Sequence, residues 1–129
     1  MKVYLSSNFL YSLIHSEGKE NIKNLLLDSI DSNTRFYTST YTIHLLFSKL
    51  GTIDTEKKTM ILRNVEDLVD SIFDLSMEEI RSDLLLGEGL GLEQVIALNQ
   101  GMDLFYQNSI EDMVMHHLLK VRNFFGETK

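Results

Sequence analysis

The stretch that decides the fold lies at the start of the chain and reads Val3-Tyr4-Leu5-Ser6-Ser7-Asn8-Phe9-Leu10-Tyr11-Ser12-Leu13-Ile14. Its first three residues are apolar or aromatic and suit a strand, and two small polar residues follow them. The apolar residues then recur at helical spacing, and the hydroxyl of Ser6 or Ser7 can cap the first turn of a helix. The sequence therefore predicts a short buried strand that runs straight into a helix.

Short strands and amphipathic helices continue to alternate along the chain. Further strands are expected over 35–40 and 103–106, with a possible short one over 72–75. Helices are expected after each of them, including one that ends at Gly51, one capped by Asp54, and one that opens with a Ser76/Glu79 capping box. This order predicts an α/β fold with a small, mainly parallel sheet covered by helices on both faces.

Two segments near the carboxyl terminus are less clear. Gly87, Gly89 and Gly91 break a helix; they do not form a dinucleotide-binding fingerprint, because no strand precedes them. Residues 110–125 fit either a helix throughout or a helix followed by an edge strand over 118–124. Periodicity alone leaves both readings open.

Composition limits the class of protein. The chain has 129 residues, of which 43% are hydrophobic, enough for one domain over residues 1–129 with its own core. It has no cysteine, so disulfides, thiolate nucleophiles and zinc-thiolate sites are excluded. It contains no run of about 20 apolar residues and no secretory signal pattern. We therefore expect a soluble cytoplasmic protein that does not enter membranes.

The charge argues against general nucleic-acid binding. The formal net charge is −7, and Lys57 and Lys58 are the only adjacent basic pair. Affinity for RNA or DNA rests mainly on neutralising phosphates, so RNA binding is expected to be weak or absent.

The opening stretch and residues 89–103 resemble the PIN-domain ribonucleases, the toxin-type enzymes of bacterial and archaeal toxin–antitoxin pairs. The resemblance implies a PIN-like three-layer α/β/α sandwich with a sheet of four to five strands, in which 3–5, 36–38 and 104–106 are neighbours. In that family four carboxylates meet at the carboxyl edge of the sheet and hold Mg²⁺ or Mn²⁺, which activates water against a phosphodiester.

Carried onto this sequence, the resemblance finds few of those carboxylates. The family-equivalent positions are Ser6, His44, Glu93 and Ser109, so Glu93 is the single acid among them. Asp112 is a candidate for a displaced second acid. A hydroxyl brings no charge to a metal, and a neutral imidazole suits Mg²⁺ less well than an anionic oxygen does.

The leading hypothesis is a non-catalytic binding or regulatory module with a degraded metal site and no cofactor. A divergent ribonuclease that holds Mg²⁺ or Mn²⁺ through His44, Glu93 and Asp112 is the first alternative. An unrelated small α/β interaction protein is the second. Because toxin-type PIN domains commonly dimerise, we also expect a homodimer or a protein partner at a second apolar surface made of Leu25, Leu26, Leu27, Ile30, Leu45 and Phe47.

Overall fold

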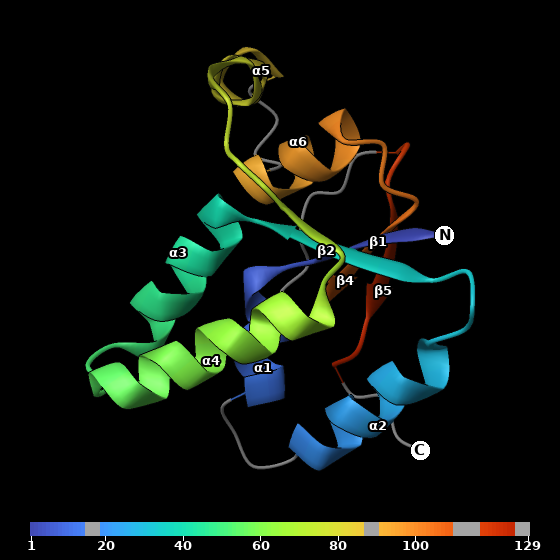
Figure 1. Ribbon diagram of the computed structural model, residues 1–129. Helices are drawn as coiled ribbons and strands as arrows, with labels where there is room; N and C mark the ends of the chain where they lie inside the picture. The colour runs from blue at the N-terminus through green and yellow to red at the C-terminus, as the bar shows by residue number, and fades with distance from the viewer. Residues whose placement is uncertain (15–18, 87–90, 110–116, 126–129) are drawn as a thin grey trace.

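Five parallel strands form one sheet in the order β3-β2-β1-β4-β5 (Figure 1). The structure, a computed structural model, describes residues 1–14, 19–86, 91–109 and 117–125. The strands are β1 (Lys2–Leu5), β2 (Arg35–Ser39), β3 (Ser71–Phe73), β4 (Leu104–Gln107) and β5 (Lys120–Asn123). The first strand of the chain lies at the centre, and β2 and β4 flank it, which confirms the predicted neighbours.

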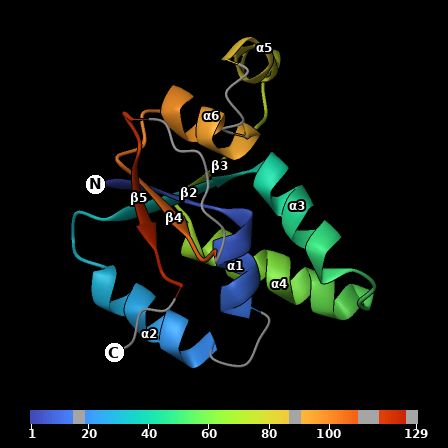
Figure 2. The same ribbon diagram turned by 180° about the vertical axis from the view of Figure 1, so that it is seen from behind.

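Helices cover both faces of this sheet, as Figures 1 and 2 show. They are α1 (Ser7–Ile14), α2 (Lys19–Ser29), α3 (Thr40–Leu50), α4 (Thr55–Leu68), α5 (Met77–Leu86) and α6 (Leu92–Asn99). Apolar residues of α1 to α4 pack into one core, and those of α6 pack into a second core on the other face. The predicted three-layer α/β/α sandwich is therefore confirmed.

The pleat of β1 divides its side chains between these two cores. Val3 and Leu5 face the larger core, whereas Tyr4 faces the α6 side. The Tyr4 ring stacks on Phe105 of β4, with ring centroids 5.7 Å apart and ring planes 2° from parallel. Because successive strand residues point to opposite faces, the part of a strand that is buried on both sides must be apolar, as Val3, Tyr4 and Leu5 of β1 are.

The predicted helix ends are also found. Asp54 accepts a hydrogen bond from the backbone of Lys57 at 2.7 Å, which caps α4. Ser76 Oγ accepts from the backbone of Glu79 at 3.1 Å, and Glu79 Oε1 accepts from the backbone of Ser76 at 3.0 Å, completing the capping box of α5. Gly51 ends α3 with φ of 70°, a conformation that favours glycine.

One of the open questions receives a structural answer. The strand β5 pairs with β4 at one edge of the sheet, which confirms the edge-strand reading of 118–124. The expected helix from 110, the residue Asp112, and Gly87 and Gly89 lie outside the described residues. None of the described helices has both the length and the apolar character that crossing a bilayer would require.

The predicted second apolar surface needs correction. Leu25 and Leu26 are buried in the larger core, because this side of α2 faces the sheet. Leu27 of α2 and Ile30, just beyond the end of the helix, are 55% and 42% exposed. The part of α2 that is open to a partner is therefore narrower than the sequence suggested.

Candidate functional site

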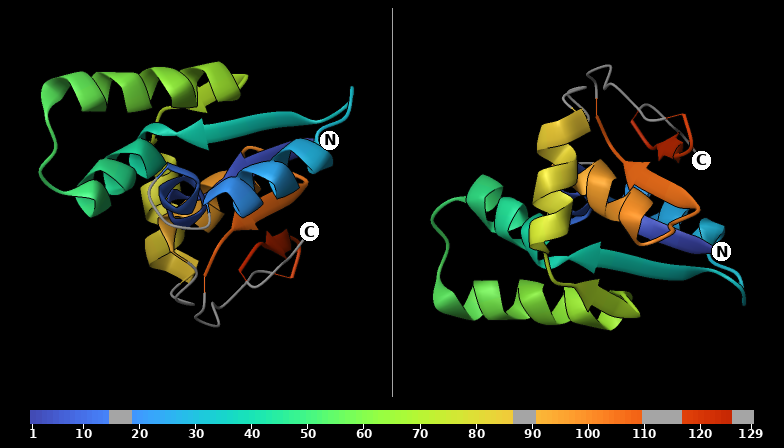
Figure 3. Two further views of the ribbon diagram at one scale, coloured as in Figure 1. Left: turned by 90° about the horizontal axis from the view of Figure 1, so that it is seen from below. Right: turned by 90° about the horizontal axis from the view of Figure 1, so that it is seen from above.

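The candidate site lies at the carboxyl ends of β1 and β2, where the helices α1, α3 and α6 begin. All strands are parallel, so their carboxyl ends meet at one edge, the usual place for ligand sites in such sheets. In the view from above (Figure 3, right), α6 lies over the sheet beside α5. Glu93, in the first turn of α6, is the acid that the fold brings there.

The carboxylate of Glu93 is held by three donors from two other helices. Its Oε2 accepts from the backbone N–H of Ser7 at 2.8 Å and from the Thr42 hydroxyl at 2.6 Å. Its Oε1 accepts from the Ser7 hydroxyl at 2.9 Å. The side chain thus sits at the amino terminus of α1, where the helix dipole favours negative charge.

A buried group of hydroxyls supports this arrangement. The Tyr4 hydroxyl lies 2.6 Å from Ser39 Oγ and 2.7 Å from Thr42 Oγ1. Ser39 also caps α3, because its hydroxyl accepts from the backbone of Thr42 at 3.1 Å. Burial raises the pKa of Tyr4, and the negative charge of Glu93 raises it further.

Ser6 occupies the end of β1 without a charge. Its buried hydroxyl donates to Asn8 Oδ1 at 2.7 Å and accepts from the backbone of Phe9 at 3.3 Å, so Ser6 caps α1 as predicted. Asn8 Oδ1 also accepts from the backbone of Asn108 at 3.0 Å. The position that carries an acid in the resembling family is therefore a satisfied helix cap here.

A small polar cavity of about 110 Å³ lies between these groups. Ser6, Asn8, Tyr41, Glu93 and Gln94 contribute its polar lining. Burial raises the pKa of Tyr41, followed by the charges of Glu93 and of Asp83 on α5.

The other predicted positions lie elsewhere. His44 is exposed on α3, two residues and thus about 200° around the helix from Thr42, which faces Glu93. Ser109 exchanges hydrogen bonds with Asn123 at the end of β5, at 3.1 and 2.8 Å. Asp112 lies outside the described residues. The structure thus brings together Ser6 and Glu93, but it does not place His44 or Ser109 in the cavity lining.

Four residues of the site were not singled out from the sequence as site residues: Ser7, Asn8, Thr42 and Tyr41. The sequence offers no specific signal for the hydroxyls, since serine and threonine also occur as ordinary helix caps.

The residues at this site determine whether it can hold a metal ion. Within the described ranges, no group of three or more His, Cys, Asp or Glu side chains is placed to hold one. Among the described residues that line the cavity, Glu93 is the only acid. Mg²⁺ and similar hard cations are usually held by carboxylate oxygens together with water or substrate phosphates, and Glu93 already receives three hydrogen bonds from this chain.

Comparison with known proteins shows which fold this is. No family model and no curated protein matches the sequence. The structure of VapBC2 from Rickettsia felis, bound to a DNA fragment from its promoter, matches with a TM-score of 0.66 and 18% identity, over 95% of this chain and 98% of that one. The sarcin-ricin loop-cleaving toxin VapC20 from Mycobacterium tuberculosis matches with a TM-score of 0.63 and 10% identity, over 83% of this chain and 89% of that one. The chain therefore has the PIN-domain fold of the VapC toxins.

Proposed function

We propose that this chain is a single PIN-like domain over residues 1–129 that binds a protein partner and does not cut RNA by metal-dependent chemistry. The observation that carries this proposal is the hydrogen bonding of the Glu93 carboxylate. Its two oxygens already accept three hydrogen bonds from Ser7 and Thr42. The neighbouring strand end presents the hydroxyl of Ser6, which is itself engaged with Asn8.

The electrostatic reason is general to this chemistry. A catalytic metal must be held by anionic oxygens and must lower the pKa of its bound water, so that hydroxide forms near neutral pH. Ser6 contributes no formal negative charge, and His44 is exposed on α3 and does not line the cavity. One carboxylate at the cavity supports neither firm metal binding nor activation of water by that route.

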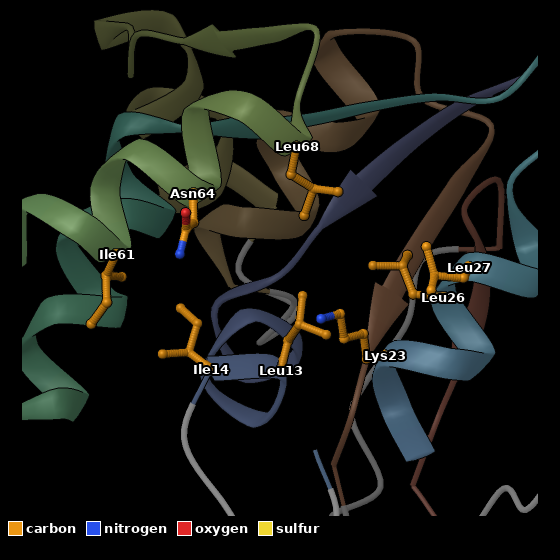
Figure 4. A pocket seen from close by; sticks show the side chains of 8 residues that line it. All are labelled: Leu13, Ile14, Lys23, Leu26, Leu27, Ile61, Asn64 and Leu68. Atoms are coloured by element: carbon orange, nitrogen blue, oxygen red, sulfur yellow. The ribbon is translucent and has the colours of Figure 1, made fainter. Parts of the chain in front are cut away.

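A separate feature supports a protein partner. A groove of about 520 Å³ lies between α1, α2 and α4 and is lined by Leu13, Ile14, Lys23, Leu26, Leu27, Ile61, Asn64 and Leu68 (Figure 4). Among these described lining residues Lys23 carries the only charge. We infer that the occupant is an amphipathic helix that offers an apolar face and a carboxylate for Lys23.

The two structural neighbours support a toxin–antitoxin pair as the setting for such a partner. The Rickettsia felis neighbour is VapBC2 bound to a DNA fragment from its promoter. A small antitoxin-like protein whose helix fills the groove would give this chain a regulatory role without nuclease activity. A homodimer and a cytoplasmic location remain predictions; light scattering at high protein concentration tests the first.

The activity is tested by incubating the purified protein with single-stranded and structured RNA in Mg²⁺ or Mn²⁺. We expect no cleavage beyond buffer controls. Metal-dependent cleavage that is lost in Glu93→Gln would instead support the divergent ribonuclease that uses His44, Glu93 and Asp112, an activity comparable to that named for the Mycobacterium tuberculosis neighbour.

The groove is tested with a displayed library of helical peptides, selected on the wild-type protein. We expect enriched peptides with apolar residues at i, i+3, i+4 and i+7 and one acidic residue, and we expect Leu27→Asp to lose them. Lys23→Glu should select a basic residue in place of the acid, whereas Lys57→Glu at the exposed start of α4 should select the original peptides. Enrichment that survives Leu27→Asp would contradict this occupant.

A further inference from the structure

The hydrogen bonds that end at Glu93 have a single possible direction. A hydroxyl donates one proton, whereas a carboxylate oxygen accepts. Thr42 Oγ1 gives its proton to Glu93 Oε2 at 2.6 Å. Its contact with Tyr4, at 2.7 Å, can therefore be a hydrogen bond only if the Tyr4 hydroxyl is the donor.

The same reasoning fixes the next link. Because the Tyr4 hydroxyl donates its single proton to Thr42, the Tyr4 oxygen must accept from the Ser39 hydroxyl, which lies 2.6 Å away. Ser39 Oγ in turn accepts from the backbone of Thr42 at 3.1 Å. The buried hydroxyls thus form a one-way series, from Ser39 to Tyr4 to Thr42, that ends on the carboxylate of Glu93.

These groups come from elements that are far apart in the chain. Tyr4 lies on β1, Ser39 at the end of β2, Thr42 on α3 and Glu93 on α6. The same carboxylate is also bonded to α1, because its two oxygens accept from the backbone N–H and from the hydroxyl of Ser7. Aligned hydrogen bonds that end on a charged acceptor are stronger than neutral ones, and they polarise one another in a buried setting.

We propose that Glu93 is a structural tether: it closes this one-way series and fastens α6 to the beginnings of α1 and α3, so that donors of the chain itself occupy the place that a cation would take. This role goes beyond partner binding. It rests on the proposed function only in requiring no metal ion at Glu93. The protein should then reach its full stability without divalent ions.

A double-mutant cycle tests the tether. Thr42→Val removes the hydroxyl with little change in shape, and Glu93→Gln removes the charge while keeping an acceptor oxygen. We expect each to raise the unfolding equilibrium constant by about tenfold or more in urea. The double variant should raise it by clearly less than the product of the two, because both remove the same interaction.

Matched controls separate the tether from general effects of substitution. Glu78→Gln changes an exposed first-turn acid of α5, and Thr52→Val changes an exposed loop threonine. Both should leave the unfolding equilibrium constant within about twofold of the wild type. Thr42→Ser keeps a hydroxyl, so it should retain most of the coupling to Glu93.

A spectroscopic measurement reports the direction of the series. The buried hydroxyl protons of Thr42 and Tyr4 should exchange slowly enough for detection by NMR. In Glu93→Gln both resonances should move upfield, because the charged acceptor at the end is gone. Unmoved resonances, or fully additive effects in the cycle, would overturn the tether and leave the proposed function standing.

Metal ions provide the remaining test. Millimolar Mn²⁺ or Mg²⁺ should not shift the urea midpoint of the wild-type protein. A rise in that midpoint with Mn²⁺, absent in Glu93→Gln, would show that the carboxylate serves a metal ion and would overturn the tether. The RNA cleavage assay then decides separately whether the proposed function also fails.

Discussion

Asn108 donates its backbone N–H to the side-chain oxygen of Asn8 at 3.0 Å, although the two residues are 100 positions apart in the sequence. The same oxygen accepts the hydroxyl proton of Ser6 at 2.7 Å. One amide group thus joins the ends of β1 and β4 just where the candidate site begins.

Removing that amide should cost stability. Asn8→Ala leaves the hydroxyl of Ser6 and the backbone of Asn108 without their acceptor, so we expect a loss of about 1–3 kcal/mol in the free energy of unfolding. Urea denaturation followed by circular dichroism measures it. Asn24→Ala, on the exposed side of α2, serves as the control and should lose nothing. Equal stability of the two variants would mean that the amide has no such role.

Glu79 should matter more than its exposed neighbour on the same helix. It is only 1% exposed, and it accepts hydrogen bonds from Ser76 and from the side chains of Asn99 and Gln100. Glu79→Ala leaves these donors unpaired and detaches α5 from α6, so we expect a loss of about 2–4 kcal/mol. Glu78→Ala should stay within about 0.5 kcal/mol of the wild type in the same urea experiment.

The helix phase of α3 predicts which substitution could restore a metal site. Thr42 donates to Glu93 and Lys49 donates to Ser7 at the start of α1, and Leu45 lies on the same stripe of α3 between them. Ser6→Asp with Leu45→Glu should therefore place two new carboxylates near Glu93 and allow weak Mn²⁺ binding, measured by calorimetry. Ser6→Asp with His44→Glu puts the second acid on the exposed side and should bind no Mn²⁺. Equal binding by both pairs would contradict this assignment of the stripe.

Stability should decline at alkaline pH because of Tyr4. Burial and the charge of Glu93 raise its pKa in the folded state, so the folded protein keeps the proton to higher pH than the unfolded chain does. Its contribution is complete below the ordinary tyrosine pKa of about 10 and is lost as pH rises above that value. The expected slope is at most about 1.4 kcal/mol per pH unit for this group.

Urea denaturation at several pH values above 9 measures this slope. Tyr4→Phe should flatten it, while lowering stability near neutral pH because Ser39 and Thr42 lose their partner. Tyr41→Phe should flatten it less, since the pKa of Tyr41 is also raised but its side chain is only half-buried. An unchanged slope in Tyr4→Phe would show that another group governs alkaline unfolding.

The fold was largely predictable because its signals are local. The apolar, strand-prone segments around Val3, Phe36 and Phe105 are the three central strands. Helix boundaries at Gly51, Asp54 and Ser76 depend on capping groups within a few residues of each other, which a sequence displays directly. The edge strand β5 could not be separated from a helix, because both patterns fit and only its pairing with β4 decides between them.

The site was less predictable because it depends on helix phase and on contacts between distant elements. The sequence identified Glu93 and Ser6, which stand at element boundaries. It did not show that His44 lies on the exposed side of α3, since a shift of one or two residues rotates a side chain by about 100° to 200°. Nor did it show that Ser7 and Thr42 would donate to Glu93, because these partners are 86 and 51 residues away.

The central position of β1 has a consequence for how the chain folds. Lys2, at the start of this strand, is the first part of the sheet to be synthesised, yet it is hydrogen-bonded to Asp103, 101 residues later. One edge of β1 therefore stays without its native neighbour until most of the chain exists. Contacts between residues so far apart in the sequence slow folding. An apolar strand whose edge is unpaired is prone to aggregate until its neighbour is formed. A ribosome-bound fragment that ends before β4 should consequently depend on chaperones that cover strand edges.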